Sequence, residues 1–179
     1  MSAPGVEVSG PGLALALALA LVFTLPALAL PGVAAAGCPS TAGCPQPAVN
    51  GTDPNDAVMR ELIEQAARQE LGTGGPSYPQ IGRGNPVTVT EDATMPCVLL
   101  QAIGIVESSW TQFCGSGGGP TIISFDCGYG VTQVTSGMGT GSMGALSFSP
   151  ARVASEAGYN IGTGAGILVI KWLSVPSIG

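Results

Sequence analysis

One carboxylate closes a strongly apolar stretch of the chain. Glu107 follows residues 97–106, which are almost all apolar, and Trp110 comes shortly after it. An acid at the end of an apolar helix and beside an indole is expected to lose water, and desolvation disfavours the charged form of a carboxyl group. We therefore expect Glu107 to hold a proton near neutral pH and to act as a general acid. The alternative is a helix-end Glu that faces solvent.

The composition excludes several kinds of chemistry. The chain has 179 residues, no His and a formal net charge of -6 at pH 7. Without His, Ser-His-Asp and Cys-His mechanisms are excluded, and no metal site is expected because C-x-x-C pairs are absent as well. Only 5 residues are Lys or Arg, and they stand singly, so the sequence does not predict nucleic-acid binding.

The N-terminal part is typical of an export signal. Residues 13–30 are almost entirely Leu and Ala, Pro26 interrupts them, and residues 34–36 form an Ala-x-Ala cleavage site. This order predicts a signal peptide over residues 1–36, with a retained membrane anchor as the alternative. Residues 37–52, rich in Pro, Gly, Ser and Cys, are expected to form a tether. We expect an exported protein, in the periplasm or cell envelope or secreted.

The cysteines fit an oxidising compartment. We expect a disulfide between Cys114 and Cys127, which flank a Gly-rich loop. Cys38 follows small residues, as in a bacterial lipoprotein box, so a lipid at Cys38 could attach the chain to a membrane. Without lipidation, Cys38 could bridge Cys44, and Cys97 could be a buried free thiol.

Residues 53–179 predict a single, mainly α domain, with a Gly-rich segment at 114–146 that lines a site or is mobile. Start and stop signals define its helices. The expected helices begin at Asp53-Pro54 and end at Gly72, run from Thr94 or Met95 to about Trp110, run from Ser149-Pro150 to Ala157, and run from Asn160 to Pro176. The last helix carries an apolar stripe that we expect to be buried, namely Ile161, Ala165, Leu168 and Trp172.

Three short stretches occur in the order of a known family. They are Glu107–Trp110, Cys127–Val134 and Asn160–Leu168. Over about residues 53 to 173 the chain resembles the soluble lytic transglycosylase family, which carries Glu-Ser-x-aromatic, then Gly-Leu-Met-Gln, then Asn-Ile-x-x-Gly. The resemblance implies a lysozyme-like domain with a Gly-rich active-site loop. It further implies that the partner is a peptidoglycan glycan strand and that no cofactor is needed. We expect a monomer.

The resemblance also implies roles for particular residues. Glu107 would act as acid and then as base, while the C6 hydroxyl of the sugar attacks and a 1,6-anhydro product forms. Ser108, Gln133, Tyr129 and Asn160 would bind the substrate. For Ser108 and Asn160 the alternative is helix capping.

Other side chains near these motifs have open roles. Trp110, like Tyr129, could offer an apolar face to a sugar ring or lie in the core. Asp126 is expected to cap a turn.

The chain departs from the family at two places. Val131-Thr132 stand where the family has Leu-Met, and the chain ends at Gly179 before the family's Ala-Tyr-Asn motif. We therefore expect a truncated chain or a more open cleft, with Tyr159 as the nearest replacement for the missing Tyr. Two alternative functions follow. One is a goose-type-like hydrolase that acts on peptidoglycan or chitin with two carboxylates. The other is a catalytically weak glycan-binding protein.

Overall fold

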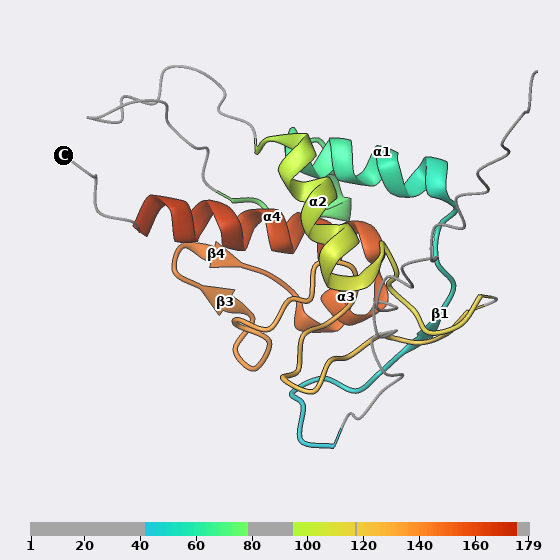
Figure 1. Ribbon diagram of the computed structural model, residues 1–179. Coiled ribbons are helices and arrows are strands. Elements are labelled where there is room, and N and C mark those ends of the chain that lie inside the picture. Colours follow the sequence, from blue (N-terminus) through green and yellow to red (C-terminus); the bar gives the residue numbers. More distant parts are fainter. Residues whose placement is uncertain (1–41, 79–94, 117, 175–179) are drawn as a thin grey trace, which may run out of the picture. The chain divides into compact units, whose positions relative to one another are not determined.

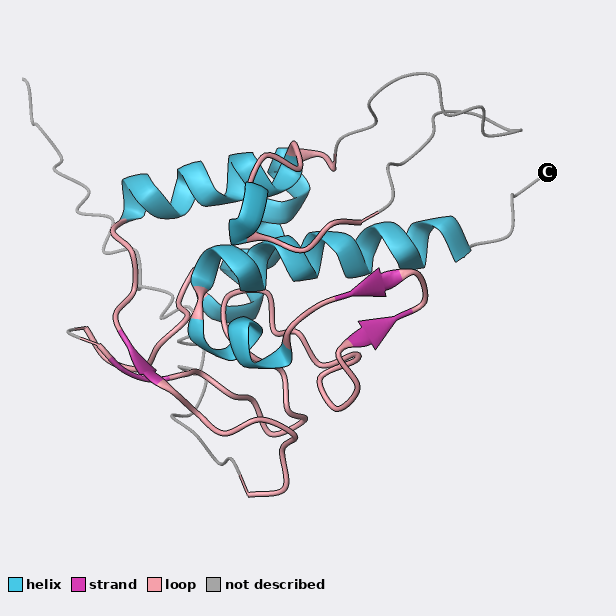
Figure 2. Ribbon diagram, turned by 180° about the vertical axis from the view of Figure 1, so that it is seen from behind, coloured by secondary structure: helices cyan, strands magenta, loops and turns pink. Residues whose placement is uncertain are grey.

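The computed structural model describes residues 42–78, 95–116 and 118–174. Over these residues the fold is mainly α, as predicted, and long irregular segments join the helices (Figures 1 and 2). The helices are α1 (Asp56–Ala67), α2 (Cys97–Ser108), α3 (Pro150–Ser155) and α4 (Ala157–Ser174), with a short 3-10 helix η1 (Gly72–Gly74). The predicted signal peptide, the lipidation site at Cys38 and the helix end at Pro176 lie outside the described residues.

Two small antiparallel strand pairs accompany the helices. Strand β1 (Asn50–Gly51) pairs with β2 (Gly119–Pro120), and β3 (Ser142–Met143) pairs with β4 (Leu146–Ser147). The second pair forms a hairpin whose strand β4 contacts α4. Both sheets are therefore minor: the β1–β2 pair joins two loops, and the β3–β4 hairpin lies against α4.

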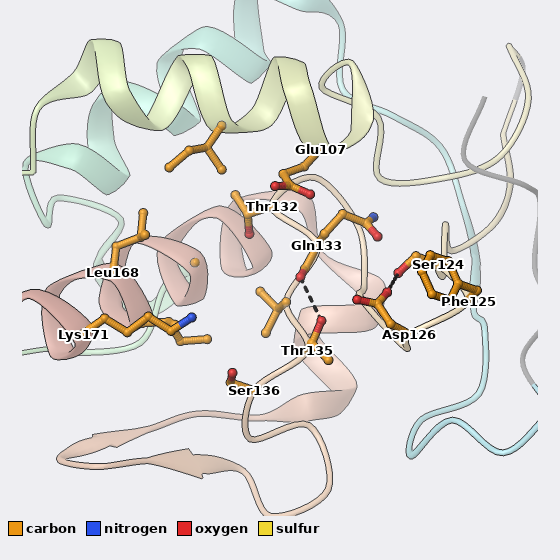
Figure 3. A pocket seen from close by; sticks show the side chains of 14 residues that line it. Glu107, Ser124, Phe125, Asp126, Thr132, Gln133, Thr135, Ser136, Leu168 and Lys171 are labelled. Atoms are coloured by element: carbon orange, nitrogen blue, oxygen red, sulfur yellow. Dashed lines mark hydrogen bonds between the residues drawn. The ribbon is translucent and has the colours of Figure 1, made fainter. Parts of the chain in front are cut away.

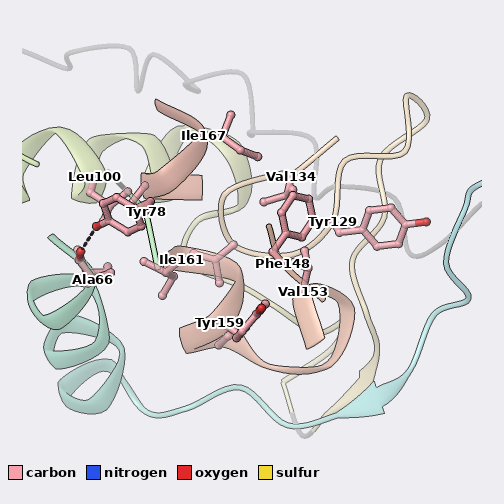
Figure 4. Close-up of a cluster of buried hydrophobic side chains, with 14 of the residues drawn as sticks. Ala66, Tyr78, Leu100, Tyr129, Val134, Phe148, Val153, Tyr159, Ile161 and Ile167 are labelled. Atoms are coloured by element: carbon pink, nitrogen blue, oxygen red, sulfur yellow. Dashed lines mark hydrogen bonds between the residues drawn. The ribbon is translucent and has the colours of Figure 1, made fainter. Parts of the chain in front are cut away.

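Helix α4 is the centre around which the other elements pack. Every residue from Tyr159 to Ile167 is buried, and α1 and α3 both contact this helix. Figure 4 shows Tyr159, Ile161 and Ile167 within the cluster of buried side chains. Glycines within it cost helix stability, about 1 kcal/mol each relative to Ala. At Gly162 the reason is close packing, because an added Cβ would lie 2.8 Å from the Leu71 side chain. The small residues of α4 therefore let neighbouring segments approach its backbone.

The predicted apolar stripe of α4 is buried only over its first half. Ile161 and Ala165 are fully buried and Leu168 is half-buried, but Trp172 is 67% exposed. The apolar pattern of the helix therefore continues into its last turn, where Trp172 and Leu173 are exposed.

Several helix boundaries differ from the prediction. Helix α1 begins at Asp56, because the Asn55 side chain accepts hydrogen bonds from the Ala57 and Val58 amides, each at 3.1 Å. It ends at Ala67 and not at Gly72. The predicted cap, Asp53, instead accepts the backbone N–H groups of Gln112 (2.7 Å) and Phe113 (3.2 Å). A carboxylate can serve amides far away in sequence, which local signals do not reveal.

The start of α3 is predicted correctly, whereas that of α4 is not. Ser149 caps α3 and Pro150 is its first residue. Helix α4 begins at Ala157, so Asn160 lies inside the helix and is not its cap. A helix that starts directly after another leaves no room for a separate capping signal.

The described part of the predicted tether is bonded to the helical domain. Cys44 forms a disulfide with Cys127, with Cα atoms 5.4 Å apart, and β1 pairs with β2. The predicted pairs Cys114–Cys127 and Cys38–Cys44 are therefore wrong, and Cys114 is itself disulfide-bonded. Disulfides need close Cα atoms, and the fold brings Cys44 to Cys127 across 83 residues of sequence. Cys97 is free, as in the alternative without lipidation, but it is half-buried.

Helix α2 buries only a narrow side. Leu100 and Gly104 are buried, whereas Val98, Ile105 and Val106 are exposed. The apolar run therefore does not form a buried helix. Among the described helices, none combines the length and apolar character that crossing a membrane requires.

A buried phenol makes the fold sensitive to alkaline pH. Tyr78 is 7% exposed, donates a hydrogen bond to the Ala66 carbonyl at 2.5 Å, and has a pKa raised by burial to about 12 (Figure 4). In the unfolded chain a Tyr has a pKa of roughly 10. The neutral phenol therefore stabilises the folded protein fully below about pH 10, and this stability, about 3 kcal/mol in total, is lost as the pH rises through about 12.

We expect Tyr78→Phe to remove most of this alkaline dependence. Its own cost is about 1 kcal/mol, because the Ala66 carbonyl keeps the hydrogen bond from the Gln69 amide. A smaller dependence remains through Tyr129, whose pKa burial also raises. Urea unfolding between pH 9 and pH 11 measures the difference, and equal pH slopes for variant and wild type would contradict the assignment.

Candidate functional site

A cleft of about 520 Å³ lies between α2, α4 and two loops (Figure 3). Its polar and charged lining comes from four separate segments of the chain. The lining residues are Ile103 and Glu107 of α2, Ser124 to Asp126, Thr132 to Ser136, and Gly164, Ile167, Leu168 and Lys171 of α4.

Glu107 projects into this cleft from the C-terminal end of α2. Figure 3 shows its carboxylate directed toward the loop that carries Thr132 and Gln133. The side chain is exposed, so the desolvation that we expected for it is absent from the free protein. The acid therefore faces solvent in a position open to a ligand.

The expected neighbour of Glu107, the Trp110 indole, lies elsewhere. It lines a second hollow of about 450 Å³ together with Asp53 and Met59, and that hollow does not include Glu107. Its Nε1–H donates to the Gln101 carbonyl at 3.0 Å. The left-handed backbone of Ser109 (φ 54°) and Trp110 (φ 62°) turns the chain away directly after α2. Trp110 therefore offers no face to a ligand beside Glu107.

Ser108 ties the end of α2 to the 129–134 loop. Its hydroxyl donates a hydrogen bond to the Val131 carbonyl at 2.8 Å and accepts one from the Thr111 N–H at 3.1 Å. Both interactions are internal, and the alternative of a helix-end role is the better description. Ser108 acts by fixing where Glu107 stands.

Asn160 is the main anchor of the same loop. The side chain is fully buried, and its Nδ2 donates to the Tyr129 carbonyl at 2.6 Å and the Val153 carbonyl at 3.2 Å. Its Oδ1 accepts the backbone N–H of Thr132 at 2.9 Å. Because the Asn160 side chain is buried, it cannot contact a substrate directly, and the predicted binding role is corrected. It sets the conformation of the loop that faces Glu107.

Gln112 completes this buried network, and the sequence analysis missed it. Its side-chain amide donates to the Val153 and Ala154 carbonyls, each at 3.0 Å, and accepts the Val131 N–H at 3.2 Å. An isolated Gln carries no signal in the sequence. Only the fold brings it beneath the loop.

Tyr129 is also buried and cannot stack on a sugar. The side chain is fully enclosed, and its hydroxyl and the Gln46 backbone exchange hydrogen bonds of 2.8 Å (Figure 4). The predicted binding role is corrected here as well. Tyr129 joins the 129–134 loop to the segment held by the Cys44–Cys127 disulfide.

Gln133, for which substrate binding is predicted, lines the cleft, but its amide is turned inward. The Nε2 group donates to the Gly130 carbonyl at 2.7 Å, and Oε1 is buried with no partner among the described residues. Its backbone is left-handed, with φ 46°. A buried acceptor without a partner costs about 1–3 kcal/mol, so this loop is held in a strained state by its surroundings.

Two side chains that the sequence analysis did not select flank the cleft. Phe125 is 96% exposed, and Lys171 comes from the last turn of α4. Figure 3 shows them at opposite ends of the cleft, with Glu107 between. The available sequence signal for Phe125 was an aromatic residue directly before Asp126 and the 127–134 stretch, whereas nothing local distinguishes Lys171.

Asp126 occupies the turn that was predicted for it and also lines the cleft. Its carboxylate accepts a hydrogen bond from the Ser124 hydroxyl, and the Cys127 amide closes the turn on the Ser124 carbonyl at 3.0 Å. Glu107 and Asp126 thus share one cleft. Among the described residues, no group of three or more His, Cys, Asp or Glu side chains could hold a metal ion.

Comparisons with models of protein families, with curated proteins and with solved structures find no match to this chain.

The buried network predicts which glycine the 129–134 loop cannot lose. Gly130 has φ +63°, and an added Cβ would lie 2.0 Å from the Gln112 Oε1. We expect Gly130→Ala to lower the free energy of unfolding by about 2–5 kcal/mol, since it combines backbone strain with overpacking.

Gly139→Ala is the matched control, because its nearest atom would be 4.0 Å away and its φ is not positive. Chemical denaturation of both variants measures the difference. Equal stability of the two variants would show that the network does not constrain the loop.

Proposed function

We propose that this chain is a lysozyme-like domain that cleaves the MurNAc-GlcNAc bond of peptidoglycan as a lytic transglycosylase, with Glu107 as its catalytic residue. One observation supports this above others. The three stretches that resemble the family come together around one cleft, through the contacts of Ser108 with Val131 and of Asn160 with Thr132. Motifs that matched by chance would have no reason to converge.

Backbone strain near the cleft also supports a functional role. Among the described residues, five other than glycine have positive φ, and Ser109, Trp110, Cys127 and Gln133 are four of them. These four lie in the two loops that flank Glu107 and Asp126. Each such conformation costs about 1–3 kcal/mol, and strain of this kind concentrates at sites that bind or react.

The proposed reaction needs only one carboxyl group. Glu107 donates its proton to the glycosidic oxygen as the bond from that oxygen to C1 of the muramyl sugar breaks. The resulting carboxylate then takes the proton of the C6 hydroxyl, whose oxygen bonds to C1 and closes the 1,6-anhydro ring. Glu107 ends protonated, and no water is consumed. A glycan in the cleft would displace water from Glu107 and favour its neutral form.

A two-carboxylate hydrolase is the second candidate, because Asp126 lines the same cleft. In that scheme Asp126 would act as base or nucleophile on peptidoglycan or chitin. Its hydrogen bond from Ser124 would hold the carboxylate in place. The third candidate is a glycan-binding protein with little activity, and the exposed position of Glu107 in the free protein is the observation in its favour.

Export is part of the proposal. The Cys44–Cys127 disulfide is typical of an oxidising compartment, such as the periplasm or the cell exterior. Lipid attachment at Cys38 stays a prediction.

Conservative replacement of the two acids separates these functions. We expect Glu107→Gln to lower the rate of cleavage of purified sacculi by about 10²–10⁴-fold, because Gln cannot donate the proton. Asp126→Asn should retain most of the activity, as should the control Glu61→Gln on the exposed side of α1. The products, identified by mass spectrometry, should carry anhydromuramyl ends.

Other results would support the alternatives. Reducing ends, one water heavier, together with an inactive Asp126→Asn would favour the hydrolase. Full activity of Glu107→Gln would rule out Glu107 as the acid, and binding to sacculi with no cleavage by the wild type would favour the glycan-binding protein.

Phe125 gives an independent test of where the glycan lies. An exposed aromatic ring at the rim of a sugar cleft can stack on the apolar face of a pyranose. We expect Phe125→Ala to raise KM by about 3- to 10-fold with little change in kcat, and Phe125→Tyr to behave like the wild type. Trp172→Ala, which removes an exposed aromatic side chain outside the cleft lining, is the control. Equal KM values for Phe125→Ala and the control would place the glycan elsewhere.

A further inference from the structure

Lys171 is the one basic side chain among the described residues that line the cleft. It follows Gly164, Ile167 and Leu168 on the same face of α4, which forms one wall of the cleft. Figure 3 shows its side chain extending into the cleft toward the loop with Thr135 and Ser136. Its ammonium group is therefore available to a ligand that occupies the cleft.

The other described basic side chains, all arginines, are already engaged within the protein. Arg68 pairs with Glu64 and Glu70, Arg152 pairs with Glu156, and Arg60 stands over the Trp110 ring. Lys171 makes no salt bridge with any described residue. In a chain with a net charge of -6, an unpaired cation in the cleft is an exception to the prevailing charge.

The other charged groups of the cleft are acidic. Asp126 lies at the Phe125 end of the cleft and Glu107 lies between the two ends, and both would repel an anion, whereas Lys171 would attract one at the other end (Figure 3). Phe125, Glu107 and Lys171 line the same cleft, so a ligand that contacts both Phe125 and Lys171 would extend along the part of the cleft that Glu107 faces. The cleft therefore favours a sugar chain that carries an acidic group to one side of the bond to be cleaved.

We propose that Lys171 binds a carboxylate carried by the glycan and so selects muramyl strands over neutral glycans such as chitin. This inference rests on the proposed function. The carboxylate has two sources in peptidoglycan. One is the stem peptide, and the other is the carboxylate of the lactyl group, which is freed when the peptide is removed. A Lys on a flexible stem suits a single carboxylate whose position varies, whereas a bidentate site would favour Arg.

Binding measured without turnover tests the proposal. We would use the Glu107→Gln protein and titrate three ligands by calorimetry: glycan strands with stem peptides, strands with the peptides removed, and a chito-oligosaccharide of similar length. Adding Lys171→Gln should weaken binding of at least one carboxylated ligand by about fivefold, the size expected for one partly exposed charge pair. Whichever carboxylated ligand responds identifies the source of the carboxylate.

Three controls make the result specific. Binding of the chito-oligosaccharide should not change, Lys171→Arg should retain most of the affinity, and Arg60→Gln, which removes the same charge outside this cleft, should have no effect. The difference in affinity for the carboxylated ligand between the proteins with and without Lys171 should also decrease as salt is added. If Lys171→Gln changes the affinity for neither carboxylated ligand, the inference is wrong. It is also wrong if the substitution weakens binding of the chito-oligosaccharide to the same extent.

Failure of this inference can be told from failure of the proposed function. If the wild type cleaves sacculi to anhydro products but Lys171→Gln binds all ligands unchanged, only the role of Lys171 is wrong. If the wild type cleaves nothing but binding still depends on Lys171, the cleft recognises acidic glycans and the proposed chemistry is wrong. If neither cleavage nor binding of any glycan occurs, both are wrong.

Discussion

The buried carboxamide of Asn160 is the interaction on which the arrangement of the cleft depends. It bonds the backbone of the 129–134 loop at Tyr129 and Thr132 and also reaches Val153 of α3. A fully enclosed amide must satisfy both its donors and its acceptor, because each unmet group costs about 1–3 kcal/mol. The placement of the loop in this structure meets this demand, and it holds the loop opposite Glu107.

The small residues of α4 make this placement possible. Gly164 lies so close to the loop that an added Cβ would be 2.3 Å from the Thr132 hydroxyl oxygen. A second fastening comes from the N-terminal side, where the Cys44–Cys127 disulfide and the Tyr129–Gln46 contact hold the opposite edge of the loop. The strained backbone at Gln133 is therefore supported from two directions, and it does not relax into the cleft.

This division of labour explains why the side chains with predicted binding roles act mostly through the backbone. Ser108, Tyr129 and Asn160 are occupied by internal hydrogen bonds, and they position groups that they do not themselves present. Among the residues that line the cleft, Glu107 and the flanking Phe125 and Lys171 are the ones for which we propose contact with a ligand. Glu107 is exposed in the free protein, so the chemistry that we propose for it would depend on a ligand that excludes water.

The sequence by itself determined the mainly α class, the apolar pattern of the first half of α4, the start of α3 at Ser149-Pro150, and the place of Glu107 near the end of α2. These features are local, because caps, prolines and helical periodicity act over a few residues. It also pointed to the loop that contains Gln133, through motifs alone.

The tertiary structure decided what depends on contacts between distant segments. It paired Cys44 with Cys127, buried Tyr129 and Asn160, and moved the Trp110 indole away from Glu107. Burial is a property of the whole fold, since a side chain loses water only when remote segments cover it. For the same reason Lys171 became part of a cleft only when α4 packed against the loops, 64 positions after Glu107 in the numbering of the chain.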